Sequence, residues 1–79
     1  MRKKELRAIV TFYTTSEAFA CEKACKDMIK GGRLMPAPRA LSADCGIAYR
    51  AEIEQKDKVK EILEANGIEY HGIHEIETY

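Results

Sequence analysis

The residue best suited to chemistry is Cys45, which is followed by Gly46 and stands between Arg39 and Arg50 in the sequence. A thiolate is a strong nucleophile, and the pKa of a thiol falls when cationic side chains or oriented backbone amides lie close to it. A glycine beside the sulfur leaves room for a bulky partner and lets the backbone amides turn toward an anion. Free cysteines are also among the most buried residue types, so a packing role for Cys45 remains open on these grounds.

Two further cysteines, Cys21 and Cys25, are one helical turn apart on an apolar stripe, which favours core packing. Strong metal sites use two-residue spacers with further ligands nearby, and the Cys-Glu-Lys-Ala-Cys spacing does not follow that pattern. A resolving thiol is the functional alternative for this pair.

The two histidines, His71 and His74, are three residues apart in a segment expected to be a strand. Their side chains should point to opposite faces unless Gly72 inserts a bulge, so we expect surface histidines rather than a chelating pair. The sequence has no Gly-rich phosphate loop, no serine with a paired histidine motif and no carboxylate pair placed for acid and base roles. We therefore expect no metal and no cofactor, and an accessory protein rather than a stand-alone enzyme.

Four segments are typical of strands, because β-branched, aromatic and other apolar residues alternate in them. They are residues 6–13, 33–39, 47–52 and 68–77. The second should be short, because Pro36 and Pro38 lack amide hydrogens. In the first, one face carries Leu6, Ala8, Val10 and Phe12, and the other carries Arg7, Ile9, Thr11 and Tyr13. We expect the first of these faces in the core, and the second to form an exposed apolar and aromatic patch.

Apolar residues at three- and four-residue spacing predict two helices. The first starts at Thr14, where a threonine followed three residues later by Glu17 forms a capping box, and it ends at residues 31–32, Gly-Gly. Its buried stripe comprises Ala18, Cys21, Ala24, Cys25, Met28 and Ile29. The second helix covers residues 57–65 and ends at Asn66-Gly67. Its inward residues are Val59, Ile62 and Leu63.

The predicted order of strand, helix, strand, strand, helix, strand defines the fold class. It corresponds to an α+β, ferredoxin-like βαββαβ domain, in which a four-stranded antiparallel sheet carries both helices on one face. A chain of 79 residues has room for one domain, residues 1–79. A core of this size supplies only ~3–5 kcal/mol of net stability, so a homodimer through the open sheet face or a strand edge is a reasonable expectation.

Composition excludes several classes of function. The formal net charge is zero, although residues 1–50 carry ten Lys or Arg against five Asp or Glu and residues 51–79 carry three against eight. Zero net charge argues against a nucleic-acid partner. No stretch approaches the ~20 apolar residues of a membrane span. Three cysteines leave one thiol over in any pairing, and we expect free thiols in a cytoplasmic protein.

The run from Pro36 to Arg50 resembles the central motif of the putative Se/S carrier protein-like family, also called DUF3343. That motif consists of a Pro-x-Pro-Arg stretch, a serine, a Cys-Gly pair and an apolar strand ending near an arginine. Here it reads Pro-Ala-Pro-Arg at residues 36–39, Ser42, then Cys45-Gly46. The likeness extends upstream to residues 12–18 and to Glu22-Lys23, and it covers nearly the whole chain.

The resemblance implies a small bacterial or archaeal protein that holds sulfur or selenium as a persulfide or selenopersulfide. By position, Cys45 matches the carrier cysteine, Gly46 its partner, and Arg39 and Arg50 the neighbouring basic residues. A cysteine desulfurase-type donor would load Cys45, and an acceptor enzyme would receive the cargo. Two other hypotheses stay open: a non-catalytic binding or assembly module, and a thiol redox sensor that pairs Cys45 with one of the helix cysteines.

Overall fold

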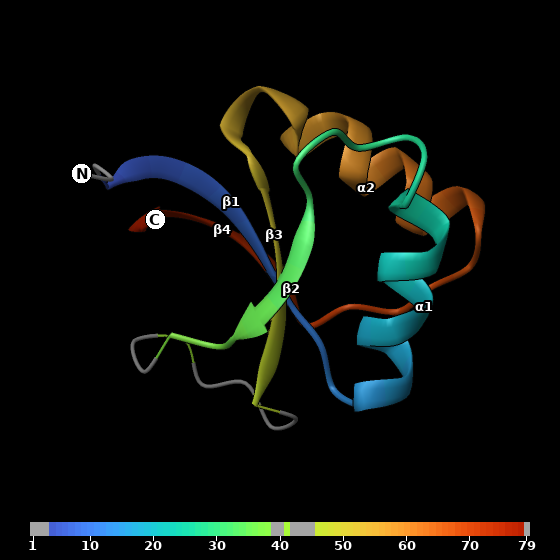
Figure 1. The fold of residues 1–79 in the computed structure, drawn as a ribbon. Coiled ribbons are helices and arrows are strands. Elements are labelled where there is room, and N and C mark those ends of the chain that lie inside the picture. The colour runs from blue at the N-terminus through green and yellow to red at the C-terminus, as the bar shows by residue number, and fades with distance from the viewer. Residues whose placement is uncertain (1–3, 39–40, 42–45, 79) are drawn as a thin grey trace.

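The computed structural model describes residues 4–38, 41 and 46–78. The bounds of the elements in these residues are β1 Glu5–Thr11, α1 Thr15–Cys25, β2 Arg33–Pro36, β3 Ile47–Glu52, the short 3-10 helix η1 Ile53–Gln55, α2 Lys56–Ala65 and β4 Gly72–Thr78. The strands lie in the order β2-β3-β1-β4, and each neighbouring pair is antiparallel. Both helices lie on the same side of this sheet (Figure 1), which confirms the α+β, ferredoxin-like arrangement.

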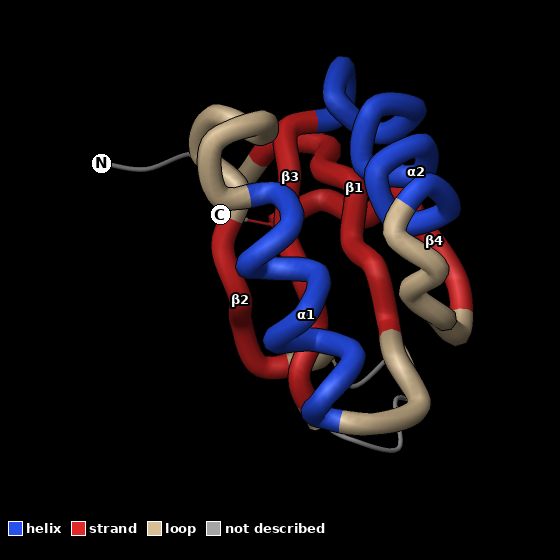
Figure 2. The backbone as a smooth tube through the Cα atoms, turned by 90° about the vertical axis from the view of Figure 1, so that its right-hand side faces the viewer, coloured by secondary structure: helices blue, strands red, loops and turns tan. Residues whose placement is uncertain are grey.

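The core fills the space between the helices and one face of the sheet. Seen from the helix side in Figure 2, α1 lies toward β2 and α2 toward β4. The buried core cluster comprises Ala8, Val10, Phe12, Ala18, Cys21, Cys25, Ile29, Tyr49, Ala51, Val59, Ile62 and Leu63. Alternation along β1, together with the apolar stripe of each helix, therefore places the predicted faces inward, and β3 adds Tyr49 and Ala51 to the core.

Two residues predicted to be in the core lie largely outside it. Leu6 is 44% exposed and Met28 is 51% exposed. The reason for Met28 is that α1 ends at Cys25, earlier than the predicted end at Gly31-Gly32. The chain then turns, with the Ile29 amide donating to the Cys25 carbonyl at 2.9 Å, so that Ile29 enters the core and Met28 faces solvent.

Local sequence signals set the start of α1 and the end of α2 as predicted. The Glu17 amide donates to the Thr14 hydroxyl at 3.3 Å, and the Thr14 amide donates to the Glu17 carboxylate at 3.2 Å, which together make the capping box. At the end of α2, Gly67 has φ +65°, and the Ile68 amide donates to the Leu63 carbonyl at 2.9 Å. This is the Schellman arrangement, for which glycine is the preferred residue.

The last strand differs from its prediction. β4 begins at Gly72 rather than at residue 68, and it pairs with β1 one residue to one, from Gly72 opposite Thr11 to Thr78 opposite Glu5. Gly72 is therefore the first residue of a regular ladder and not a bulge. His71 precedes the strand, so strict alternation does not govern its side chain.

We call the side of the sheet away from α1 and α2 the helix-free face; it carries Arg7, Ile9, Thr11, Ala48, Arg50 and His74. The prediction of an exposed apolar patch on this face is wrong for Ile9 and Thr11, which are 0% and 1% exposed. Arg7 lies two residues before Ile9 on β1. Arg50, on β3, is paired with Ile9. Both arginines are more than nine-tenths buried, so their stems lie against the sheet beside Ile9.

Candidate functional site

The connection from β2 to β3 carries the Cys-Gly pair, and its base is well defined. Pro36 pairs with Ile47 at the end of the sheet, and the Ala37 amide donates to the Gly46 carbonyl at 2.9 Å. Gly46 is exposed and has φ +73°, and apart from its chain neighbours no described residue has a heavy atom within 4 Å of the position that a Cβ would occupy. The left-handed backbone, rather than crowding, is therefore what favours glycine at this position. Among the described residues, nothing fills the space on the Cβ side of Gly46, which directly follows Cys45 in the sequence.

Cys45 and Arg39 lie outside the described residues. The structure therefore leaves the role of Cys45 as carrier thiol, and that of Arg39 beside it, as predictions.

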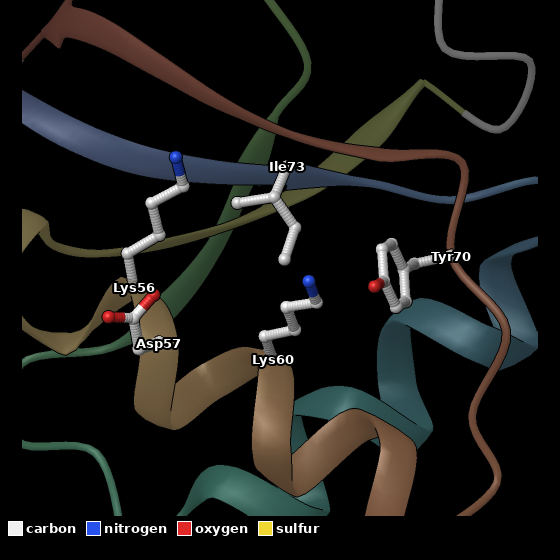
Figure 3. A pocket seen from close by; sticks show the side chains of 5 residues that line it. All are labelled: Lys56, Asp57, Lys60, Tyr70 and Ile73. Atoms are coloured by element: carbon white, nitrogen blue, oxygen red, sulfur yellow. The ribbon is translucent and has the colours of Figure 1, made fainter.

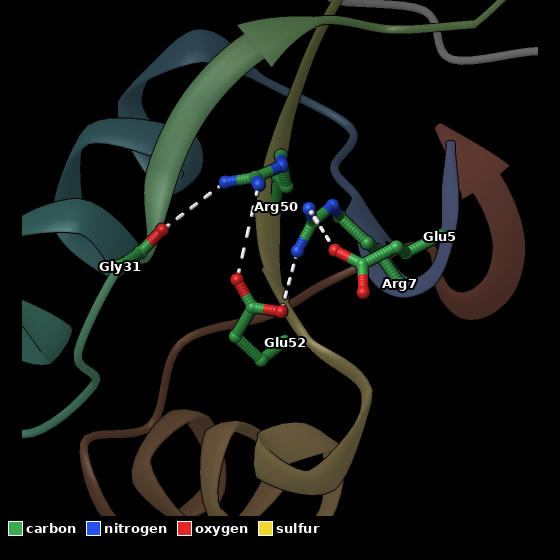
Figure 4. Close-up of polar contacts among 5 residues, drawn as sticks. All are labelled: Glu5, Arg7, Gly31, Arg50 and Glu52. Atoms are coloured by element: carbon green, nitrogen blue, oxygen red, sulfur yellow. Dashed lines mark hydrogen bonds and ion pairs between the residues drawn. The ribbon is translucent and has the colours of Figure 1, made fainter. Parts of the chain in front are cut away.

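Arg50 is 8% exposed and belongs to a network of ion pairs on the helix-free face (Figure 4). Its guanidinium donates to the Gly31 carbonyl at 3.2 Å and lies 3.8 Å from the Glu52 carboxylate. Arg7 forms an ion pair with the same carboxylate and a second with Glu5 at 3.0 Å. Glu52 thus compensates two buried cations, and Arg50 has a structural role in addition to the one predicted for it near Cys45.

Cys21 and Cys25 are both fully buried, as predicted, and are free thiols. They form a polar cluster with Tyr49, which the sequence did not reveal. The pKa of Cys21 is raised well above its ordinary value. The largest cause is its hydrogen bond with Cys25, and burial is the second. The hydrogen bonds from Cys21 and Tyr49 stabilise a charge on Cys25 and lower its pKa. Burial is the main cause that raises the pKa of the Tyr49 phenol.

The burial of both helix cysteines has a consequence for the redox-sensor hypothesis. With no exposed surface, neither sulfur can reach a thiol outside the core unless α1 moves away from the sheet. Among the described cysteines, burial therefore argues against a resolving role and favours packing.

The histidines are placed differently from the sequence-based expectation. His71 Nδ1 and His74 Nε2 each lie 3.3 Å from Thr11 Oγ1, so the two rings share one side of the sheet and the prediction of opposite faces is wrong. The Tyr13 ring meets His71 edge-on, with 5.2 Å between ring centroids. The reason is that β4 begins at Gly72, so His71 precedes the strand and its side chain does not follow the alternation. The sequence alone gave no signal for this start.

A hollow of about 360 Å³ lies on the helix side, between the start of α2 and β4 (Figure 3). Its lining residues are Lys56, Asp57, Lys60, Tyr70 and Ile73. The ammonium of Lys56 is already paired with the Glu75 carboxylate at 2.8 Å. The sequence did not single out this hollow, and its lining residues among those described come from α2, β4 and the segment before β4.

The described residues lack two features that would indicate a class of function. None of their helices has both the length and the apolar character that crossing a membrane requires. In the same part of the chain, no group of three or more His, Cys, Asp or Glu side chains is arranged to hold a metal ion.

The fold and the connection from β2 to β3 together define a small α+β domain whose central hairpin carries a Cys-Gly pair. A family model described as Putative Se/S carrier protein-like matches residues 7–75, and the chain belongs to this family. The matched range includes the whole run from Pro36 to Arg50. Comparison with curated proteins and with solved structures gave no match.

Proposed function

We propose that this protein carries sulfur or selenium on Cys45 as a persulfide or selenopersulfide. Membership of the family over residues 7–75 is the observation that supports this function most directly, because the match spans the Cys-Gly pair and both flanking arginines. The exposed, left-handed Gly46 adds support, since no described side chain crowds the backbone of the residue that follows the proposed carrier cysteine in the sequence.

The transfer chemistry needs only thiols. The Cys45 thiolate attacks the outer sulfur of a persulfide on a cysteine desulfurase-type donor; an S–S bond forms to Cys45 and the donor cysteine leaves as a thiolate. A thiolate of the acceptor enzyme then attacks the outer sulfur and releases the Cys45 thiolate. Each step makes one S–S bond and breaks another, so no external oxidant or reductant and no bound cofactor is required.

Arg39 and Arg50 are the proposed source of thiolate stabilisation. An ordinary thiol has a pKa near ~8.5 and is only a few per cent ionised at neutral pH, and cationic neighbours lower that value by one unit or more. Arg39→Ala and Arg50→Ala should therefore slow alkylation of Cys45. Arg33→Ala is the matched control, because Arg33 lies opposite Arg50 on β2 and is exposed.

The test of the carrier function is the mass of the protein after incubation with a cysteine desulfurase and cysteine. The wild type should gain about 32 Da, the mass of one sulfur atom. Cys45→Ser should gain nothing, while Cys21→Ser should gain the same mass as the wild type. A mass gain that persists in Cys45→Ser would disprove the proposed role of Cys45.

The alternative is a non-catalytic binding or assembly module, which predicts no mass gain in any variant.

A homodimer is compatible with both functions, and we propose the β4 edge as its interface. Within the described sheet, β4 pairs with β1 alone, so its second edge has unpaired backbone groups over seven residues. Light scattering that gives a monomer mass at high micromolar concentration would contradict the dimer. The carrier function and the free thiols fit a cytoplasmic protein of a bacterium or archaeon.

A further inference from the structure

Three polar side chains from distant parts of the sequence converge at one end of the helix-free face. Thr11 is the last residue of β1, His71 precedes β4 and His74 lies within β4. The Thr11 hydroxyl oxygen lies 3.3 Å from His71 Nδ1 and 3.3 Å from His74 Nε2. It is also 3.3 Å from the Gly72 carbonyl oxygen. A hydroxyl has one proton to donate, and all three contacts are longer than the ~2.7–3.0 Å of a good hydrogen bond. The cluster is therefore close together but weakly bonded.

The two separations between the Thr11 hydroxyl and the histidine nitrogens match those between ligands of one metal ion. Nitrogen and oxygen ligands bind Zn²⁺ at ~2.0–2.2 Å, and at a tetrahedral ion two such ligands lie roughly 3.3–3.5 Å from each other. His71 Nδ1 and His74 Nε2 both stand at this distance from Thr11 Oγ1. Because His71 is exposed, an ion can reach the cluster from solvent.

The backbone holds the cluster in place. The His71 amide donates to the Thr11 carbonyl at 2.7 Å, which fixes His71 beside the end of β1. A Cβ at Gly72 would lie 3.0 Å from His74 Nε2, so the glycine leaves the space that the imidazole occupies. The edge-on Tyr13 ring restricts the His71 ring from the other side.

We propose that Thr11, His71 and His74 form a binding site for a divalent transition-metal ion, with water in the remaining coordination position. Imidazole ligands suit Zn²⁺, Cu²⁺ and Ni²⁺, whereas Mg²⁺ and Ca²⁺ require carboxylate or carbonyl oxygens. Two imidazoles and a hydroxyl bring no negative charge to the ion, so the expected affinity is moderate. The site uses no residue of the Cys-Gly connection and does not depend on the proposed carrier function.

A calorimetric titration of the full chain with Zn²⁺ tests the site. The wild type should bind one equivalent, and His71→Gln and His74→Gln should each lower the affinity at least tenfold. Gly72→Ala should also weaken binding, because it displaces the His74 ring. Thr78→Val, a change at the far end of the same strand, should leave the affinity unchanged. Equal binding by the wild type and both histidine variants, or no binding by the wild type, would overturn the proposal.

Two measurements on the unmodified protein remain informative if a variant unfolds. Zn²⁺ should shift the ring-proton NMR signals of both histidines, and unshifted ring signals at saturating Zn²⁺ would overturn the site. Co²⁺ should give the visible spectrum of nitrogen and oxygen ligation. A thiolate-to-Co²⁺ charge-transfer band that disappears in Cys45→Ser would instead place the ion on the carrier cysteine and refute this assignment.

Discussion

Replacing Gly32 by alanine should remove most of the stability of this domain. The added Cβ would lie 1.9 Å from the Tyr49 hydroxyl oxygen, 2.6 Å from the ring carbon that bears it and 3.0 Å from Ile29 Cγ2. Carbon atoms in contact need ~3.5 Å, so the overlap is about 1 Å or more. Tyr49 is 1% exposed and cannot swing away, which places the expected cost at the upper end of the ~1–3 kcal/mol typical of overpacking. A core of this size supplies only ~3–5 kcal/mol in total.

Urea unfolding followed by circular dichroism measures this loss. Gly67→Ala is the matched control, since Gly67 has φ +65° and open space around it, so its cost of roughly 1 kcal/mol comes from the backbone alone. Tyr49→Phe removes the atom at 1.9 Å and should recover part of the loss, with a coupling of at least ~0.5 kcal/mol in a double-mutant cycle. The steric explanation fails if Gly32→Ala lowers the free energy of unfolding no more than Gly67→Ala does. It also fails if the effects of Gly32→Ala and Tyr49→Phe are simply additive.

Three further outcomes are expected. Native Cys45 should be alkylated faster than Cys21 or Cys25, which have no exposed surface, and mass spectrometry of the labelled peptides would reveal equal rates if this is wrong. Because the pKa values of Cys21 and Tyr49 are raised in the folded state, the unfolded state loses these two protons first as the pH rises. The free energy of unfolding should therefore fall between pH 9 and pH 11, by up to ~1.4 kcal/mol per pH unit for each group. A free energy of unfolding that stays constant over that range would contradict this. Glu52→Gln should lower the free energy of unfolding by about 1–2 kcal/mol, since it removes the carboxylate that compensates two buried arginines; an unchanged urea midpoint would refute this.

Local features of this protein were predictable because each depends on a few neighbouring residues. The capping box at Thr14 and Glu17 and the stop at Asn66-Gly67 involve groups within a turn of each other, and both form as predicted. Periodicity placed the core face of β1 and the buried helix cysteines for the same reason. The family also follows from the sequence, through the Cys-Gly pair and its fixed offsets from Pro36 and Arg39.

Features that join distant segments were decided only by the tertiary structure. Thr11 and His71 are 60 positions apart in the chain, and Arg7 and Glu52 are 45 apart. Their contacts exist because β1 is central and pairs with both β3 and β4, and no periodicity in one segment encodes the register of another. The clash that excludes a side chain at Gly32 arises in the same way, from a tyrosine on β3 whose hydroxyl is held against the turn after α1. The sequence alone therefore determined which faces are apolar, where α1 begins and where α2 ends, whereas the neighbours of each polar group depended on how the sheet assembles.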